Sequence, residues 1–184
     1  MKLSELFEKL ENSSEFKNFK KKFPKAYFCA SFFVFDYDSS ETKKQLDYCV
    51  KEGDITTFVI DEKITSQKAE TIKKEKLPEI KKEDIKIDVE EAVEKAKEEI
   101  KKMNLIPSKI IAILQIFNEK PIWNMTCLSG FSILRLHIEM NGKVSLNEKS
   151  SMLDMMKIEK GSEKHQSIGS GSESEKGSKT DYVG

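Results

Sequence analysis

The stretch Ala30-Ser31-Phe32-Phe33-Val34-Phe35-Asp36 decides the fold, because a similar stretch follows 82 residues later, Ala112-Ile113-Leu114-Gln115-Ile116-Phe117-Asn118. Further along, Cys49 aligns with Cys127, Phe58 with Leu136 and Ile60 with Ile138, each at an offset of 78. An amphipathic helical pattern precedes each copy. Half a sheet cannot cover its own apolar face, so a repeated unit predicts one sheet built from two halves.

The first half reads as helix followed by strands. Apolar residues recur at helical spacing over about residues 4–22, where Ser13 or Ser14 could cap a second helix. The run 26–37 is apolar on both faces, which is typical of a strand covered on both sides or at the sheet centre. Strands are also expected at 45–50 and 55–60, with a short fourth strand near Ile64.

The second half repeats this order. Asp88 with Glu91 resembles a capping box and predicts a helix that ends near Asn104. Strands are expected at 110–117, 122–128 and 131–140, and Asn141-Gly142 predicts a two-residue type I′ turn into a returning strand. In the third strand, Leu134, Leu136, Ile138 and Met140 alternate with Arg135, His137 and Glu139, so the two sets should face opposite sides.

These patterns predict an α+β fold made of two αβββ repeats, residues 1–65 and 88–158. The repeats form an antiparallel sheet with the helices packed on one face. Residues 66–87 are expected to be a linker that is partly helical over about 69–76. Residues 159–184 are rich in Gly, Ser, Glu and Lys, so we expect a flexible, disordered polar tail.

Composition limits the partners and the compartment. Charged residues make up 35 % of the 184 residues and the formal net charge is zero, and Arg135 is the only arginine. Nucleic-acid sites favour arginine, so no nucleic-acid partner is expected. The basic run 17–22 is interpreted as the solvent-exposed face of an amphipathic helix. The charged N-terminus and the lack of an 18-residue apolar run predict no signal peptide and no membrane span. We therefore expect a cytoplasmic protein with buried, reduced Cys29, Cys49 and Cys127.

No known catalytic or cofactor motif occurs. His137 and His165 are the only histidines, and neither shares metal-ligand spacing with the cysteines. Asp36, Asp38 and Asp47 could pair across strands to bind a cation, but such residues are more often ordinary strand ends. No metal, no cofactor and no enzymatic activity are expected.

The chain resembles PepSY-like modules of uncharacterised archaeal proteins. The motifs are Pro121-Ile122-Trp123-Asn124-Met125-Thr126 and, later, Leu136-His137-Ile138-Glu139-Met140-Asn141-Gly142-Lys143-Val144. In those proteins a Trp-Asn-hydrophobic-Thr strand precedes the form Ile-Asp-Ala-X-Thr-Gly-Glu-Val, where this chain has Glu139 for the Asp and lacks the Thr. In the first half, Phe23-Pro24-Lys25-Ala26-Tyr27 and Ile55-Thr56-Thr57-Phe58 resemble the same group. The resemblance implies helix-on-sheet packing, no known catalytic residues and, as in PepSY modules elsewhere, a link to peptidase regulation.

Three functional hypotheses remain. The first is a non-enzymatic module that binds a peptide or protein, with Trp123, Phe131, Arg135, His137 and Glu139 as the candidate binding residues. In it, Trp123 is either core or a groove anchor, and His137 forms a small polar network with Arg135 and Glu139. The second is a protein that binds a small hydrophobic ligand in a pocket between helix and sheet. The pocket would be lined by Phe32, Phe35, Phe117, Trp123 and Phe131. The third is an enzyme that uses His137 with an acidic neighbour.

Overall fold

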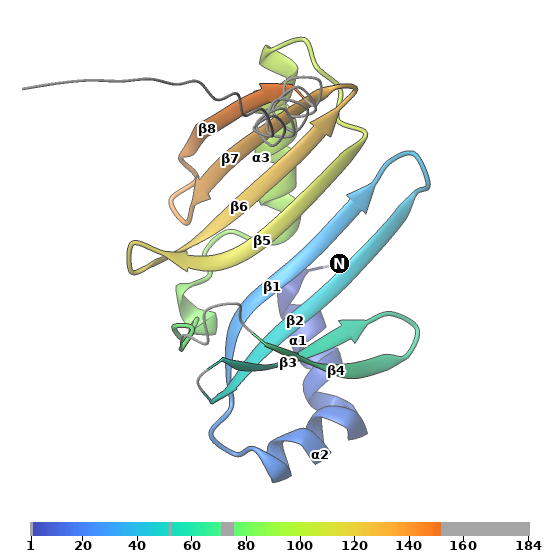
Figure 1. Cartoon of the computed structure of the whole chain (residues 1–184), viewed down its shortest axis with the longest axis vertical. Coiled ribbons are helices and arrows are strands. Elements are labelled where there is room, and N and C mark those ends of the chain that lie inside the picture. Colours follow the sequence, from blue (N-terminus) through green and yellow to red (C-terminus); the bar gives the residue numbers. More distant parts are fainter. Residues whose placement is uncertain (1, 52, 71–75, 152–184) are drawn as a thin grey trace, which may run out of the picture.

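The computed structural model describes residues 2–51, 53–70 and 76–151 (Figure 1). Its elements are α1 (Leu3–Asn12), α2 (Ser14–Lys22), β1 (Tyr27–Asp36), β2 (Glu41–Lys51), β3 (Asp54–Ile60), β4 (Ile64–Glu70), the 3-10 turn η1 (Lys82–Asp84), α3 (Val89–Lys102), β5 (Lys109–Phe117), β6 (Lys120–Ser129), β7 (Ser132–Glu139) and β8 (Val144–Ser151). The strands form one antiparallel sheet in the order β4-β3-β2-β1-β5-β6-β7-β8. The predicted α+β class with an antiparallel sheet is confirmed.

The two halves of the chain meet where β1 pairs with β5. The register runs from Ser31 opposite Leu114 to Asp36 opposite Lys109, so the sheet continues without a break across the seam. Each half supplies four strands, one more than an αβββ unit contains. β4 reaches Glu70, so the predicted linker 66–87 begins inside the sheet. The helix expected over 69–76 is replaced by strand at 69–70, and residues 71–75 lie outside the described part of the chain.

The residue-by-residue repeat is only partly reflected in the sheet. Phe58 and Leu136, aligned at an offset of 78, both lie in the core under the helices. Phe33 is also buried there, but its counterpart at an offset of 82, Gln115, is a neighbour of the core residue Leu114 on β5 and faces the other side. The two halves share the order of their elements. Residues of β1 and β5 that align in sequence nevertheless lie on different faces of the sheet.

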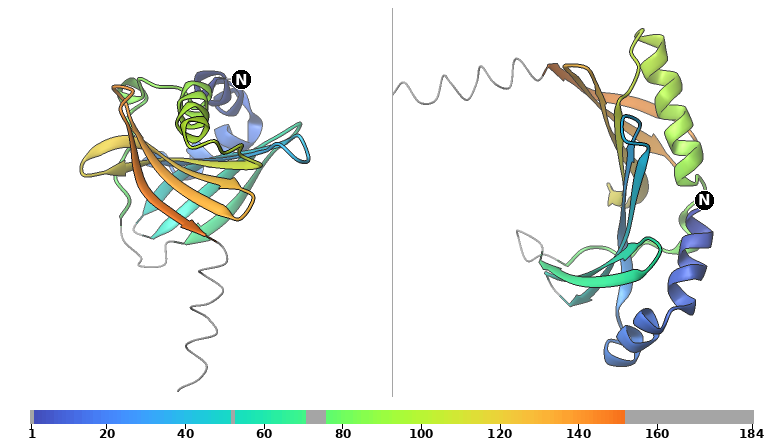
Figure 2. Two further views of the ribbon diagram at one scale, coloured as in Figure 1. Left: turned by 90° about the horizontal axis from the view of Figure 1, so that it is seen from above. Right: turned by 90° about the vertical axis from the view of Figure 1, so that its right-hand side faces the viewer.

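The helix boundaries follow from local hydrogen bonds. Ser13 separates α1 from α2: its hydroxyl oxygen accepts a hydrogen bond from the Phe16 backbone N–H at 3.1 Å, as expected for an N-cap. The Asp88 carboxylate accepts a bond from the Val89 backbone N–H at 2.6 Å and begins α3. Figure 2 shows that all three helices lie on the same side of the sheet.

The core fills the layer between the helices and the sheet. Under α2, Phe16 and Phe19 make edge-on contacts with Tyr48 and Phe58. Under α3, Trp123 is fully buried and its indole N–H donates to the Ile87 carbonyl at 2.8 Å. The predicted alternation in β7 is confirmed, because Leu134, Leu136 and Ile138 are fully buried in this layer.

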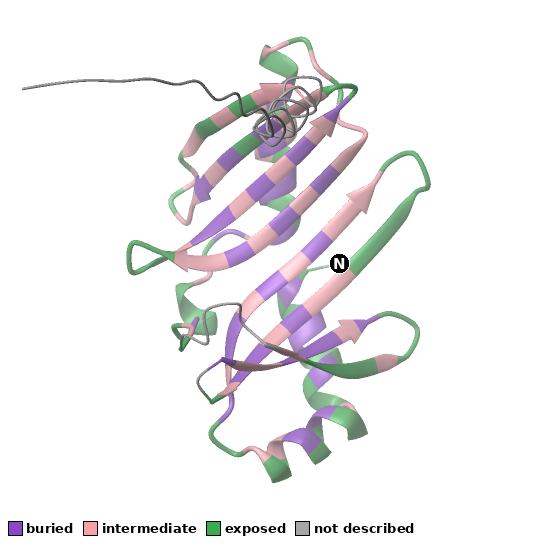
Figure 3. Ribbon diagram, in the orientation of Figure 1, coloured by how far each residue is buried: buried purple, intermediate pink, exposed green. Residues whose placement is uncertain are grey.

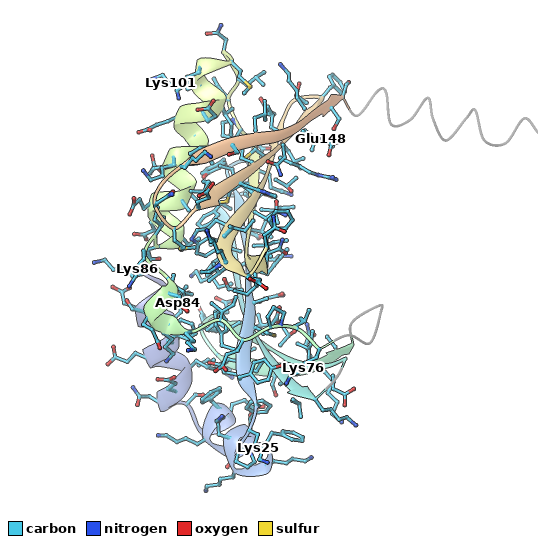
Figure 4. All side chains as sticks on the ribbon, turned by 90° about the vertical axis from the view of Figure 1, so that its left-hand side faces the viewer. Lys25, Lys76, Asp84, Lys86, Lys101 and Glu148 are labelled. Carbon is cyan, nitrogen blue, oxygen red and sulfur yellow. The ribbon has the colours of Figure 1, made fainter. Side chains whose placement is uncertain are left out.

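The opposite face of the sheet is bent and largely uncovered by the described chain. The β3–β4 hairpin and the end of β8 project away from the helices (Figure 2). Irregular pairing near Cys29, near Val50 and near Asn147 marks three bulges, and bulges increase local bend and twist. Residues 76–86 pass from this face to the helix side, since Lys76 and Asp84 lie on opposite sides of the sheet (Figure 4).

Candidate binding site on the open face of the sheet

Apolar side chains occupy the middle of the open face, at the seam between the halves. Phe32 is paired with Ile113, and Val34 with Ile111. Each is partly exposed, and each alternates with a buried core residue, so these four point away from the helices. Leu128 and Ile133, paired on β6 and β7, extend the apolar surface toward one end. We call these six residues the apolar strip.

Polar side chains flank the apolar strip on both sides. Beyond Ile113 the paired positions are Asn124, His137 and Ser145, and beyond Ile111 they are Thr126, Arg135 and Glu148. On the other side, Phe32 is paired with Gln45 and Val34 with Lys43. In Figure 3 the strands of this face alternate between buried and partly exposed positions. An exposed apolar centre with a polar rim is typical of a macromolecular binding surface.

A hollow of about 840 Å³ lies at one end of this face, between the β5–β6 hairpin and the β7–β8 hairpin. Phe117, His137, Glu139, Ser145 and Asn147 are among its lining residues. Its rim includes the β5–β6 turn, where Asn118 and Glu119 have φ of 48° and 65°. Positive φ at both central residues defines a type I′ turn, and it is strained for non-glycine residues.

His137 is held by a bulge in the edge strand. Arg135 pairs with Glu148 and Leu136 with Leu146, so Asn147 is the extra residue of β8. Its side-chain amide nitrogen lies 2.9 Å from each ring nitrogen of His137, and the Phe117 ring packs edge-on at 5.1 Å. Partial burial lowers the pKa of His137 below its ordinary value, so the ring is neutral at neutral pH. A neutral imidazole can donate one hydrogen bond and accept another.

The expected network of His137 with Arg135 and Glu139 is not formed. Arg135 donates to Glu148 at 2.8 Å, and Glu139 accepts from the Asn141 amide at 3.2 Å and lies 3.6 Å from the Lys143 ammonium. On one face of a strand, alternate residues are about 7 Å apart, so each side chain reaches its cross-strand neighbour first. The three residues share a face but not a hydrogen-bond network.

The five predicted binding residues separate into three groups. His137 and Glu139 line the hollow, and Arg135 lies beside it on the open face. Phe131 is 68 % exposed in the β6–β7 turn, at the opposite end of β7. Trp123 is fully buried on the other side of the sheet and has no surface that a ligand could contact.

The predicted aromatic pocket does not exist as one site. Trp123 lies in the core beside Phe33, whereas Phe32 faces the opposite side of the sheet. Phe117 lines the hollow near His137, and Phe131 lies in a turn. Phe35 lines a separate hollow between the helices and the sheet. The prediction grouped the rings by strand and could not assign them to faces.

The acidic residues and cysteines have structural roles. Lys109 lies 2.8 Å from Asp36 and lowers the pKa of that carboxyl to about 2, while Asp47 accepts a 2.6 Å hydrogen bond from Thr57. All three cysteines are buried and free, as predicted. Within residues 2–51, 53–70 and 76–151, no group of three or more His, Cys, Asp or Glu side chains could hold a metal ion. In the same ranges no helix has the length and apolar content to cross a membrane.

Comparison with known proteins supports the fold. The structure is similar to the crystal structure of a "putative lipoprotein" from Clostridium difficile 630, with a TM-score of 0.51. The similarity covers 73 % of this chain and 89 % of that one, at 14 % sequence identity. No family model and no curated protein matches the chain. At this identity the match is evidence for the helix-on-sheet architecture alone.

Sequence reasoning missed the apolar strip and Asn147. The signal for the strip was present, because 26–37 is apolar on both faces, but that pattern does not tell a covered face from an open one. Asn147 had no signal, since a bulge depends on how two strands pair.

Proposed function

We propose that the protein is a non-enzymatic binding module that holds a segment of another polypeptide on the open face of its sheet. The apolar strip carries this proposal. It supplies a central surface for apolar side chains, while the polar residues on either side can pair with the rest of the bound segment. In this proposal the protein is cytoplasmic and PepSY-like, and its partner is a peptidase or a protein that a peptidase processes.

Absence of enzymatic activity is part of the proposal. The His137 ring is contacted by the Asn147 amide and by the Phe117 ring, neither of which is a nucleophile or an acid. The carboxylate of Glu139 is paired with Asn141 and Lys143 instead. General acid–base catalysis needs a base within hydrogen-bond reach of a reacting group and an orienting partner, and this arrangement supports binding better.

Photo-crosslinking tests the binding proposal. A photoreactive phenylalanine analogue replaces Phe32 in the full chain, and the same analogue at the exposed Lys68 of β4 is the control. We expect one protein to crosslink in the source organism from position 32 and not from position 68. That protein, once purified, should bind the Ile113→Lys variant about tenfold or more weakly than the wild type, because a charge replaces the strip's centre. Identical crosslinks from both positions would refute the proposal.

The second candidate function is binding of a hydrophobic small molecule, and one specific hollow favours it. About 210 Å³ lies between α1, the start of α3 and strands β1 and β2, lined by Leu6, Phe33, Phe35, Thr42, Lys44, Val89 and Glu90. Displacement of a fluorescent apolar probe by medium-chain fatty acids would support this function. The Phe35→Trp variant, whose larger ring fills the hollow, should then lose probe binding, and unchanged binding would place the probe elsewhere.

A further inference from the structure

The described chain ends next to the apolar strip. Ser150 of β8 is paired with Ile133, which is itself paired with Leu128. Ser151, the last described residue, is paired with Ser132, the neighbour of the exposed Phe131. The hydroxyl oxygen of Ser150 is shielded from solvent and has no hydrogen-bond partner within the described residues. The chain therefore leaves the sheet at an apolar corner of the open face.

The sequence that follows is itself apolar. Met152-Leu153-Asp154-Met155-Met156-Lys157-Ile158 has five apolar residues in seven, whereas residues 159–184 have only Ile168, Tyr182 and Val183. These residues lie outside the described part of the chain. Methionine side chains are flexible and polarisable, and they suit contacts with an irregular surface that contains aromatic rings.

The distance is short enough for this segment to reach the strip. From β8 to β5 the sheet order has three steps of about 4.8 Å, and Ile111 is in register with Glu148, three residues before Ser151, so Ile111 lies roughly 17 Å from the end of β8. Seven extended residues span up to about 23 Å. The segment is also tethered at the site, which gives it a high effective concentration compared with any separate partner.

We propose that residues 152–158 are an intramolecular ligand of the apolar strip, with Leu153 and Met156 in contact with Ile111, Leu128 and Ile133. The segment and an external polypeptide then compete for one surface, and this second statement rests on the proposed function above. Displacement of the segment becomes a condition for partner binding, and this lowers the apparent affinity of the partner.

Thiol labelling of the full chain without any partner tests the intramolecular contact. The three native cysteines are buried, so a cysteine introduced by Ile111→Cys is the reactive thiol of the described chain. We expect a bulky maleimide to label it at least fivefold faster when Leu153→Asp and Met156→Asp are also present. Lys157→Asp is the matched control in the same segment and should leave the rate unchanged. Lys68→Cys on β4 should label at one rate in all backgrounds.

Each outcome decides the proposal. The proposal is supported if the Ile111→Cys thiol is protected from labelling at all protein concentrations and if this protection disappears with Leu153→Asp and Met156→Asp. Equal labelling in every background overturns it and leaves the external binding proposal intact, because no partner takes part in the measurement. Protection that rises with protein concentration also overturns it, since a second copy of the chain would then cover the strip.

Discussion

The carboxylate of Asp88 accepts hydrogen bonds from the backbone N–H of Leu3 at 3.0 and 3.1 Å as well as from that of Val89. One side chain therefore caps the start of α3 and holds the start of α1, which is 85 residues away in the sequence. Both helix N-termini direct their positive dipole ends at the same negative charge. This contact joins the helices of the two halves above the seam between β1 and β5.

Asp88→Ala should lower the free energy of unfolding by about 1–2 kcal/mol, because two backbone donors lose their acceptor. Asp88→Asn, which keeps one acceptor oxygen, should lower it by less. Urea unfolding followed by tryptophan fluorescence measures both, since Trp123 is the only tryptophan. Glu98→Ala on the exposed side of α3 is the control and should stay within about 0.5 kcal/mol of the wild type. Equal losses for Asp88→Ala and Glu98→Ala would contradict the bridging role.

Two hairpin turns of the second half, β5–β6 and β7–β8, lead to opposite predictions about the effect of a substitution on stability. Asn141-Gly142 does not form the predicted type I′ turn: Gly142 has φ of 87°, Asn141 does not have positive φ, and the Gly142 N–H donates to the Glu139 carbonyl. This pattern is a three-residue loop closed by a left-handed glycine. Gly142→Val should cost about 1–3 kcal/mol, because a β-branched residue is strained there and its Cβ would meet the Lys95 ammonium nitrogen at 3.3 Å.

The type I′ turn occurs instead at Asn118-Glu119, without a glycine. Glu119→Gly should raise the free energy of unfolding by about 0.5–1 kcal/mol, because glycine adopts φ of 65° without steric strain. Thermal unfolding of this variant beside Glu119→Ala separates the backbone effect from loss of the charge. A Glu119→Gly protein no more stable than Glu119→Ala would show that the turn is not strained.

His137 should make stability depend on pH. Burial lowers its pKa in the folded state, so in the window below the ordinary value of about 6.5 the unfolded chain binds more protons. The contribution of His137 to the free energy of unfolding should therefore fall as pH decreases through this window and remain constant above it. His137→Gln should flatten the profile. A His137→Gln profile as steep as that of the wild type would assign the dependence to other groups.

The cysteines should resist labelling in the native state. Cys29, Cys49 and Cys127 are at most 3 % exposed, and burial raises the pKa of the Cys127 thiol to about 12. At Cys127 the reactive thiolate is therefore scarce as well as inaccessible. An Ellman assay at pH 8 should detect less than about 5 % of the thiols in minutes and all three after denaturation. Rapid reaction of the thiols in the native protein would show that a strand pair opens readily.

Local patterns were predicted well, and features that depend on pairing were not. The alternation in β7, the Ser13 cap and the start of α3 at Asp88 follow from spacing along one segment, so they were readable from sequence. The extension of β4 into residues 66–70 was missed because its polar residues gain order from pairing with β3. The position of Trp123 and of Asn147 depends on which face or which bulge a strand presents, and a single strand does not encode that.

The seam between β1 and β5 also determines how the chain comes apart and reassembles. Every other strand pair joins neighbours in the sequence, so β1 with β5 is the one pair that brings distant segments of the described sheet together. A chain cut between residues 70 and 76 would yield two fragments, each with a complete set of hairpins and one newly unpaired edge, β1 in the first fragment and β5 in the second. Those edges are complementary to each other, so the fragments should recombine noncovalently, as a split reporter does.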